Sequence, residues 1–416
     1  MTFSGLLIAA LLDLSAGAAA PAASPLQKMA KDVLARVETL RGQKLSKPLR
    51  SGVKARPEVT KFIQERLRDE YGPEKVAAEG ELLRLMGLVP PGTDYGDLVT
   101  RLLTEQVAGF YDHTRQELHI ADWIEPALQE PVMAHEIFHA IQDQEWGGGK
   151  LIDSKTYSQD QVLAHAALLE GDATYVMLAY TQAKMTGQAT LEVDPFTLTF
   201  TAAALPVSMM SNEFPVMASA PDYLKQSLVF PYQFGLTFLA SLRNQGWKSA
   251  DFRKLYANPP ASTEQILHPE KYTSQPDAPS VVTVQLPKGV RRTWEGCAGE
   301  FHYRLMLLQR LPPGVAEAAA AGWDGDYTAL EVHTVAGKAL SVVTAVTVWD
   351  SAEDATAFED AVKRAHAARR SDPAVRVELA TLRSGTTVSL TLSEDAAFGA
   401  RILAGLPART QVTPRL

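Results

Sequence analysis

The stretch that decides the fold reads MAHEIFHAIQD, residues 133–143, and it places two histidines four residues apart with a glutamate directly after the first. Prolines precede it and the glycines at 147–149 follow it, which are the start and stop expected of one α-helix. Residues four apart share a helix face, so the ring nitrogens of His135 and His139 can bind one cation. Glu136 lies about a third of a turn round the helix, where it can reach a water on the open side of that cation.

The residues around the two histidines are apolar, so we expect this helix to be largely buried, with core contacts at Val132, Ile137, Phe138 and Ile141. Two buried histidines need polar partners, and a metal ion supplies them. This argument disfavours the alternative in which the histidines are merely a packed or solvated pair.

A third ligand is expected from the next predicted helix, which begins at Ser158 with Gln161 three residues on, the capping-box arrangement. Its segment ALLEGDATYV offers the carboxylates of Glu170 and Asp172. Glu170 stands among alanines and leucines, where a carboxylate is costly to bury unless it is paired or coordinating. Gly171 is unfavourable inside a helix and indicates a close approach of backbone or metal.

The segment HEIFH, followed 31 residues after its second histidine by the glutamate of EGDA, resembles the gluzincin type of zincin metallopeptidases. The resemblance implies that His135, His139 and Glu170 hold one Zn²⁺, and that Glu136 is the general base for a metal-activated water. The upstream GFYD and ELHI segments resemble the edge strand that lines the substrate cleft of such enzymes. The resemblance covers residues 105–185 and continues more loosely to about residue 272.

Further site residues are expected from the chemistry of this family. Gluzincins often stabilise the oxyanion with a tyrosine or histidine from the later part of the domain, and His268, Tyr232 and Tyr175 are candidates that the sequence does not rank. Carboxylates usually orient zinc-bound histidines, and Asp143 and Asp172 could do so here. Alternatively, Asp143 is a surface residue near the helix end and Asp172 is a cap or faces solvent.

The remaining patterns predict an α+β protein. Residues 21–104 form a predicted helical region, 105–289 a mainly helical zincin-like catalytic domain with a short edge-strand hairpin, and 290–416 a smaller α+β domain. In the last part we expect strands at 327–335 and 339–350, a helix capped by Ser351, a hairpin within 374–393 and a closing helix at 396–404.

Composition narrows the chemistry and the location. The single cysteine, Cys297, excludes a disulfide framework and a zinc site made of several thiolates, and the net charge of −8 argues against nucleic acid as a partner. The first 20 residues, an apolar run from Gly5 to Leu12 followed by small residues, predict a signal peptide. We therefore expect an exported protein, periplasmic or secreted, without a membrane span in the mature chain; without a signal peptide it is cytoplasmic.

The expected function is a zinc metallopeptidase acting on a peptide or protein. Two alternatives stay open, namely an inactive binding protein on the same scaffold and a metal-dependent hydrolase of non-peptide substrates. The presence of both histidines, the general base and the third carboxylate favours an enzyme.

Overall fold

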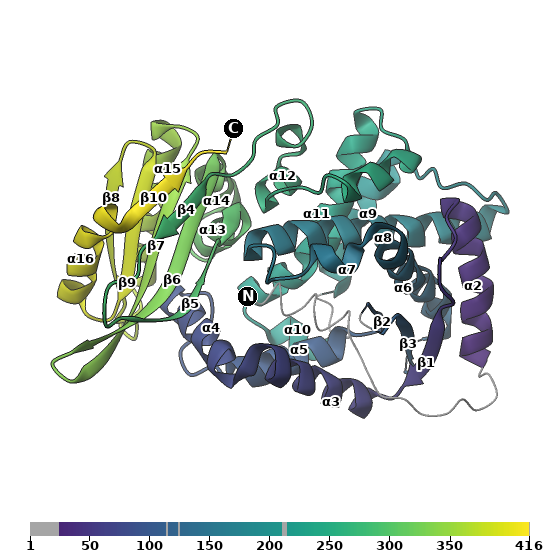
Figure 1. Ribbon diagram of the computed structural model, residues 1–416, viewed down its shortest axis with the longest axis horizontal. Coiled ribbons are helices and arrows are strands. Elements are labelled where there is room, and N and C mark those ends of the chain that lie inside the picture. Colours follow the sequence, from purple (N-terminus) through teal and green to yellow (C-terminus); the bar gives the residue numbers. More distant parts are fainter. Residues whose placement is uncertain (1–24, 114, 124, 210–213, 416) are drawn as a thin grey trace.

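The computed structural model describes residues 25–113, 115–123, 125–209 and 214–415, so the predicted signal peptide lies outside the described residues. It shows a helical part and a part built on a larger sheet, side by side (Figure 1). The mixture of helices and mainly antiparallel sheets confirms the predicted α+β class.

The helical part contains most of the chain up to residue 271. Its helices are α2 (Pro25–Arg41), α3 (Arg56–Arg66), α4 (Gly72–Met86), α5 (Tyr95–Gln106), α6 (Pro126–Trp146), α7 (Gly148–Leu151), α8 (Gln159–Thr186), α9 (Pro195–Met209), α10 (Pro215–Ser219), α11 (Asp222–Asn244) and α12 (Thr263–Leu267), with the π-helical turn η1 (Leu67–Tyr71) and the 3₁₀ turns η2 (Ser249–Tyr256) and η3 (Pro269–Lys271).

The ends of α6 and α8 follow the predicted signals. Helix α6 has proline in its first turn and stops at Gly147, which has a φ of 71° that favours glycine. At the start of α8, the Ser158 hydroxyl accepts a hydrogen bond from the Gln161 N–H (3.2 Å), and the Gln161 side chain accepts one from the Ser158 N–H (3.1 Å). The predicted capping box is therefore confirmed.

Helix α8 lies at the centre of the helical part. Among the described residues it is the one helix long and apolar enough to cross a membrane, but 89% of its most apolar window is buried inside the protein. Such burial is typical of a core helix, and the packing of α6, α11 and α2 around α8 explains it.

A three-stranded sheet borders α6, with strand order β1-β3-β2. Strands β2 (Gly109–Asp112) and β3 (Glu117–Ala121) form the predicted hairpin. Strand β1 (Arg50–Lys54) pairs in parallel with β3 and lies inside the region predicted to be helical. Its sequence, RSGVK, is short and polar and lacks the alternation that announces a strand.

The N-terminal helices share their cores with the segment 105–289. Ala30, Val33 and Val37 of α2 belong to one apolar cluster with residues of α6 and α8, and α3 and α5 belong to another with α8 and α11. Among the described residues, both apolar clusters run across residue 104, because the helices before that position complete the walls around α6 and α8.

The C-terminal part is a five-stranded antiparallel sheet with helices on both faces. The strand order is β5 (Arg291–Gly296), β6 (Trp323–Val335), β7 (Lys338–Trp349), β9 (Thr387–Ser393) and β8 (Glu378–Ser384). Strand β4 (Val281–Val284) pairs with β10 (Thr410–Thr413), next to the 3₁₀ turn η4 (Pro407–Arg409). The strands, hairpin and closing helix expected here are present, and the Ser351 hydroxyl caps α15 as predicted.

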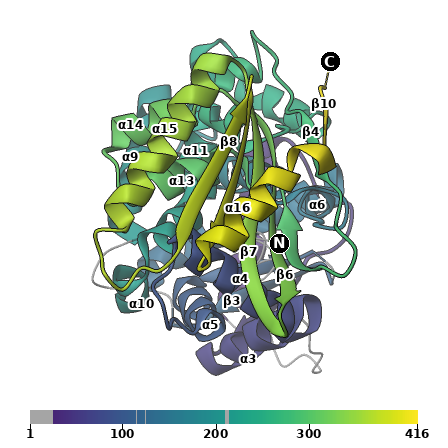
Figure 2. The same ribbon diagram turned by 90° about the vertical axis from the view of Figure 1, so that its left-hand side faces the viewer.

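Alternation along β7 separates the two faces of this sheet. Val343, Ala345 and Trp349 pack with α13 (Gly299–Leu308), α14 (Pro313–Ala320) and α15 (Ala352–Arg369), whereas Val346 and Val348 pack under α16 (Ala396–Gly405) and β4. Figure 2 looks at the β8 edge, with α15 on one side of the sheet and α16 on the other.

Two helices join the parts across the predicted boundary at residue 290. Ala78, Leu82 and Leu85 of α4 belong to the apolar cluster of the C-terminal sheet. In the opposite direction, Phe301 and Leu305 of α13 belong to the main cluster of the helical part. Each part therefore completes the core of the other.

Candidate metal centre

Helices α6 and α8 bring the predicted ligands together in a buried cluster. His135 Nε2 lies 2.9 Å from Glu170 Oε2, His139 Nε2 lies 3.4 Å from the same oxygen, and the two Nε2 atoms are 3.1 Å apart. All three side chains are buried. Three donor atoms of a His₂Glu set thus converge on one point.

The apolar packing of α6 sets the direction of these side chains. Ile137, Phe138 and Ile141 are fully buried against α2 and α8, which turns the face with His135 and His139 toward Glu170. Val132 was expected in the core, but it is partly exposed and lines the cleft beside Glu136, one turn along the helix.

The contact between α8 and α11 explains the glycine beside Glu170. A Cβ on Gly171 would lie 2.5 Å from the carbonyl carbon of Gly235, so the two helix backbones touch at this point. The close backbone approach expected at Gly171 is therefore confirmed. It also places Tyr232, one turn before Gly235 on α11, next to the predicted ligand His135.

Gln142 fixes the protonation of His139. The Gln142 side-chain N–H₂ donates to the carbonyl oxygen of Leu169 (2.8 Å), which can only accept, so the amide oxygen must be the atom 2.6 Å from His139 Nδ1. That oxygen needs a donor, and Nδ1 of His139 therefore carries a proton. In the neutral ring, Nε2 then has the free lone pair, and it points at Glu170 and His135.

A buried hydrogen-bond chain extends from Gln142 to helix α2. The side chain of Gln142 also donates to the Tyr256 hydroxyl (2.9 Å), which donates to Asp172 Oδ2 (2.7 Å), which accepts from Arg41 (3.0 Å). The guanidinium of Arg41 lies over the rings of Phe138 and Trp146 at 5.2 and 5.1 Å. Asp172 thus reaches His139 through two intermediaries.

Charge is concentrated in the cluster. Burial lowers the pKa of His139, but the Glu170 carboxylate outweighs burial and raises this pKa to about 9. Burial raises the pKa of Glu170, yet His139 and His135 outweigh it and hold that pKa well below its ordinary value. Burial raises the pKa of Glu136 above its ordinary value, with the two histidines opposing the rise. The imidazole of His139 and the carboxylate of Glu170 therefore stabilise each other's charged forms.

The three donors open into a cleft of about 240 Å³. Its polar lining includes Glu136 and Tyr232, and its walls come from α5, α6, α8, α9, α11 and the start of β2. The lining residues are Leu103, Gln106, Val107, Ala108, Gly109, Val132, His135, Glu136, His139, Glu170, Thr174, Met177, Leu205, Met209, Leu228 and Tyr232. Glu136 is partly exposed and lines this cleft together with the three donors.

Comparison with known proteins gives one partial match. A domain of unknown function (DUF8575) matches residues 289–402. This match spans the C-terminal sheet and its helices and leaves out α6, α8 and α11. No curated protein and no solved structure matches the chain.

The oxyanion candidates fall in different places. The ring of Tyr232 stacks on His135 at 6.1 Å, and burial, followed by the charges of Glu170 and Glu136, raises the pKa of Tyr232 well above its ordinary value. Tyr175 instead bonds to Ser249 and accepts from the Val193 N–H (3.0 Å), outside the cleft. Tyr232 is the candidate that the fold brings to the ligands.

His268 was a third oxyanion candidate, and the structure pairs it with a carboxylate of the C-terminal part instead of bringing it into the cleft. Its Nε2 lies 2.9 Å from Glu300 Oε1 on α13, and it does not line the cleft. The short α12 segment that carries it packs against the C-terminal part, which the sequence around His268 did not reveal.

The carboxylates expected to orient the histidines do not touch them. Asp143 accepts a hydrogen bond from the Tyr111 hydroxyl of β2 (3.1 Å), and Asp172 is paired with Arg41. Gln142 is the residue that contacts a histidine of the cluster, through the Nδ1 atom of His139. Its position three residues after His139 on the same helix face was a signal in the sequence, whereas nothing local pointed to Tyr256 or Arg41.

A second group of acidic side chains does not form a comparable cation site. Glu264, Asp277 and Asp350 lie close together, but the ammonium of Lys271 sits among them at 2.6, 3.0 and 2.7 Å. Lys271 therefore already supplies the positive charge that this group needs.

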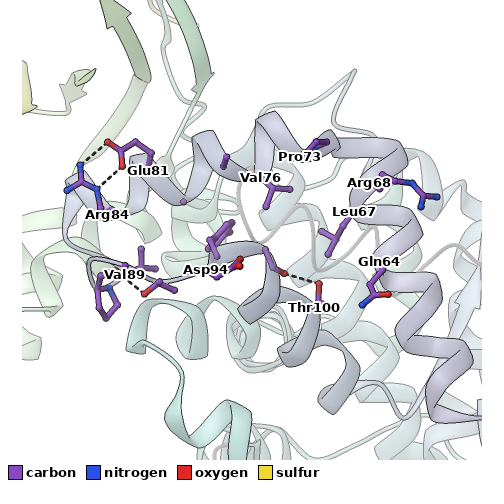
Figure 3. A pocket seen from close by; sticks show the side chains of 17 residues that line it. Gln64, Leu67, Arg68, Pro73, Val76, Glu81, Arg84, Val89, Asp94 and Thr100 are labelled. Atoms are coloured by element: carbon purple, nitrogen blue, oxygen red, sulfur yellow. Dashed lines mark hydrogen bonds and ion pairs between the residues drawn. The ribbon is translucent and has the colours of Figure 1, made fainter. Parts of the chain in front are cut away.

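A larger groove of about 770 Å³ runs between α3, α4 and α5 (Figure 3). Leu67, Val76 and Val89 form its apolar lining, and the charged Arg84 at one end is paired with Glu81 at 2.7 Å. This groove shares no lining residue with the cleft around His135 and His139.

Proposed function

We propose that this protein is a zinc-dependent metallopeptidase of the gluzincin type, with His135, His139 and Glu170 as ligands. The observation that carries the proposal is the convergence of two imidazole Nε2 atoms and one carboxylate oxygen in a buried cluster that opens beside Glu136. Three protein ligands and one open position are typical of catalytic zinc sites.

The donor set suits Zn²⁺ on chemical grounds. Zinc accepts imidazole nitrogen and carboxylate oxygen, and the hydrogen bond from His139 to Gln142 leaves the ligand nitrogen of that ring unprotonated in its neutral form. When bound, the metal would supply Lewis acidity to the water and the substrate carbonyl in the cleft.

The residues of the chain divide the remaining work. The Glu136 carboxylate accepts the proton of the attacking water and passes it to the nitrogen of the leaving amine. Burial raises the pKa of Glu136 above its ordinary value, which makes the carboxylate a stronger base. The Tyr232 hydroxyl, which keeps its proton, donates to the oxygen of the scissile carbonyl as negative charge develops there.

The cleft fits an extended peptide with apolar side chains. Strand β2 is an edge of its sheet, and Gly109 at its start lines the cleft next to Glu136, where added main chain can pair with the strand. Leu103, Val107 and Leu228 give the cleft an apolar wall. The leader at residues 1–20 supports an exported enzyme that meets peptides or proteins outside the cytoplasm.

The decisive test combines metal analysis with peptide hydrolysis. Purified protein should contain about one Zn²⁺ per chain and cleave members of a quenched-fluorescence peptide library. Glu136→Gln should retain the metal and lose at least about a hundredfold in kcat. Glu130→Gln, on the same helix but paired with Lys184 at the surface, is the matched control and should remain active.

Two results would contradict the proposal. One is a wild-type protein that binds no zinc, and the other is a Glu136→Gln variant as active as wild type. Tight zinc binding without cleavage of any library peptide would favour the alternatives of a binding scaffold or a hydrolase of other substrates.

A further inference from the structure

One ligand of the centre is held by a continuous buried hydrogen-bond chain, and the other is not. Nδ1 of His139 contacts Gln142 at 2.6 Å, whereas Nδ1 of His135 is buried and has no hydrogen-bond partner among the described residues. Among the two histidines, His139 is therefore the one whose ring orientation and tautomer are fixed by a protein hydrogen bond, and Gln142 makes that bond.

We propose that Gln142 is a positioning residue that fixes His139 as a metal ligand, and that Tyr256, Asp172 and Arg41 hold Gln142 in place. This inference rests on the proposed function. It assigns the orienting role to an amide on the same helix as the ligand, rather than to either of the two aspartates that the sequence suggested.

The direction of every hydrogen bond in the chain is determined by its two ends. At one end, the Arg41 guanidinium can only donate, so Asp172 accepts from it and from the Tyr256 hydroxyl. Since the Tyr256 proton is used on Asp172, its oxygen accepts from the Gln142 side-chain N–H₂. At the other end, the Leu169 carbonyl accepts from the same group.

The amide oxygen of Gln142 is consequently left facing His139 and cannot turn away without breaking these bonds. Rotating the amide by 180° would put its oxygen against the Leu169 carbonyl and its N–H₂ against the Nδ1 proton of His139. Both contacts would be unfavourable in a buried site. The chain therefore excludes the tautomer of His139 whose Nε2 carries the proton and cannot ligate.

The chain also connects the centre to the N-terminal helix. Arg41 is the last residue of α2, its side chain is 3% exposed, and it donates to the Ser249 carbonyl as well as to Asp172. The C-terminal end of α2 packs between α6, α8 and η2. Four hydrogen bonds connect Arg41 at this helix end to the proposed ligand His139.

The test is a comparison of matched buried substitutions. Gln142→Met keeps the size of the side chain and removes its three hydrogen bonds. Gln265→Met is the control, since Gln265 is also buried and makes three hydrogen bonds, to Ala261, Lys271 and Asp277, away from the cleft. Zinc affinity is measured by competition with a colorimetric chelator, and the Co²⁺-loaded proteins are compared by visible absorption. The melting temperature of each metal-free protein separates folding from ligation.

We expect Gln142→Met to bind Zn²⁺ about 10- to 100-fold more weakly than wild type and to change the Co²⁺ spectrum, with Gln265→Met unchanged in both. A folded Gln142→Met protein with the wild-type zinc affinity and Co²⁺ spectrum would overturn the inference. Should Gln142→Met fail to fold, Tyr256→Phe decides. It should weaken zinc binding more than Tyr175→Phe, and equal affinities would overturn the inference.

Failure of the proposed function gives a different pattern. If wild-type protein binds no zinc, or if His139→Ala binds it as tightly as wild type does, the assigned ligands are wrong and the role of Gln142 falls with them. If wild type binds zinc and His139→Ala does not, an unaffected Gln142→Met contradicts the positioning role alone.

Discussion

Gly171 of α8 and Gly235 of α11 are in direct backbone contact, and this contact positions two site residues at once. A Cβ on Gly171 would lie 2.5 Å from the carbonyl carbon of Gly235, and one on Gly235 would overlap the Ala167 carbonyl oxygen. Glu170 is the residue directly before Gly171, and Tyr232 lies about one helical turn before Gly235. The contact between these two glycines therefore sets the positions of both Glu170, the proposed third ligand, and Tyr232, the oxyanion candidate.

Replacing Gly235 should therefore disturb both stability and the site. Gly235→Ala forces α11 away from α8, and we expect destabilisation of about 3 kcal/mol or more, since a backbone rather than a flexible side chain must move. Thermal melting and zinc affinity should both fall. Gly314→Ala on α14, where an added Cβ meets nothing within 4 Å, should leave both unchanged. A Gly235→Ala variant as stable as that control would refute the tight crossing.

Removing the Tyr232 hydroxyl should slow the chemical step without affecting metal binding. Tyr232→Phe keeps the ring that stacks on His135, and we expect kcat to fall by about 10²- to 10³-fold with little change in KM or zinc content. Steady-state kinetics with Tyr175→Phe as the comparison provide the measurement. An unchanged kcat would remove Tyr232 from the reaction.

Neutralising the third ligand should release the metal. Glu170→Gln replaces an anionic oxygen with a neutral amide between two histidines, and we expect zinc affinity to fall by at least about a hundredfold. Chelator competition measures this directly. Glu264→Gln alters a buried carboxylate beside Lys271, and it should keep the wild-type affinity. Equal affinities for the two variants would show that Glu170 is no ligand.

Asp160 should make the stability depend on pH. Burial raises the pKa of Asp160 to about 8, opposed by hydrogen bonds from Thr263 and reinforced by Asp326 and Glu300. The folded protein keeps a proton on Asp160 that the unfolded chain loses near pH 4, so this group destabilises the fold progressively as the pH rises from about 4 to about 8.

The variant Asp160→Asn removes that dependence because an amide does not titrate. Its stability relative to wild type should increase between about pH 5 and pH 9, by an amount on the order of a few kcal/mol. Denaturant unfolding across this range, with the exposed Asp372→Asn as the control, measures the difference. Parallel curves for Asp160→Asn and wild type would show that Asp160 is ionised throughout.

The sequence predicted those features whose signals are local. Proline and glycine bounded α6, Ser158 and Gln161 capped α8, and the spacing of His135 and His139 defined a shared face. Gly171 indicated a close approach at this point of the helix, because glycine is unfavourable in a helix interior. The strands β6, β7 and β9 were also predicted, since each is a run of β-branched and apolar residues.

Features that depend on distant partners were missed. The pairing of β1 with β3 is set by packing and not by the polar sequence of β1. His268 belongs to the junction with α13, and Asp172 to an ion pair with Arg41, 131 residues earlier in the chain. The sequence pointed to carboxylates as partners of His139, although an amide oxygen serves equally well as an acceptor for the imidazole N–H.

Helices α4 and α13 each contribute apolar residues to the core of the other part, and this limits which fragments of the chain can fold. A fragment covering residues 289–402 would lack Ala78, Leu82 and Leu85. The apolar residues of the C-terminal part that pack against them would then be exposed to water. A fragment ending before residue 289 would lack Phe301, whose ring centroid lies 4.0 Å from that of Phe230 on α11. Phe230 is two positions before Tyr232, so the loss would disturb the packing of the helix that carries Tyr232. The chain should therefore be expressed with both its helical part and its C-terminal part for biochemical experiments.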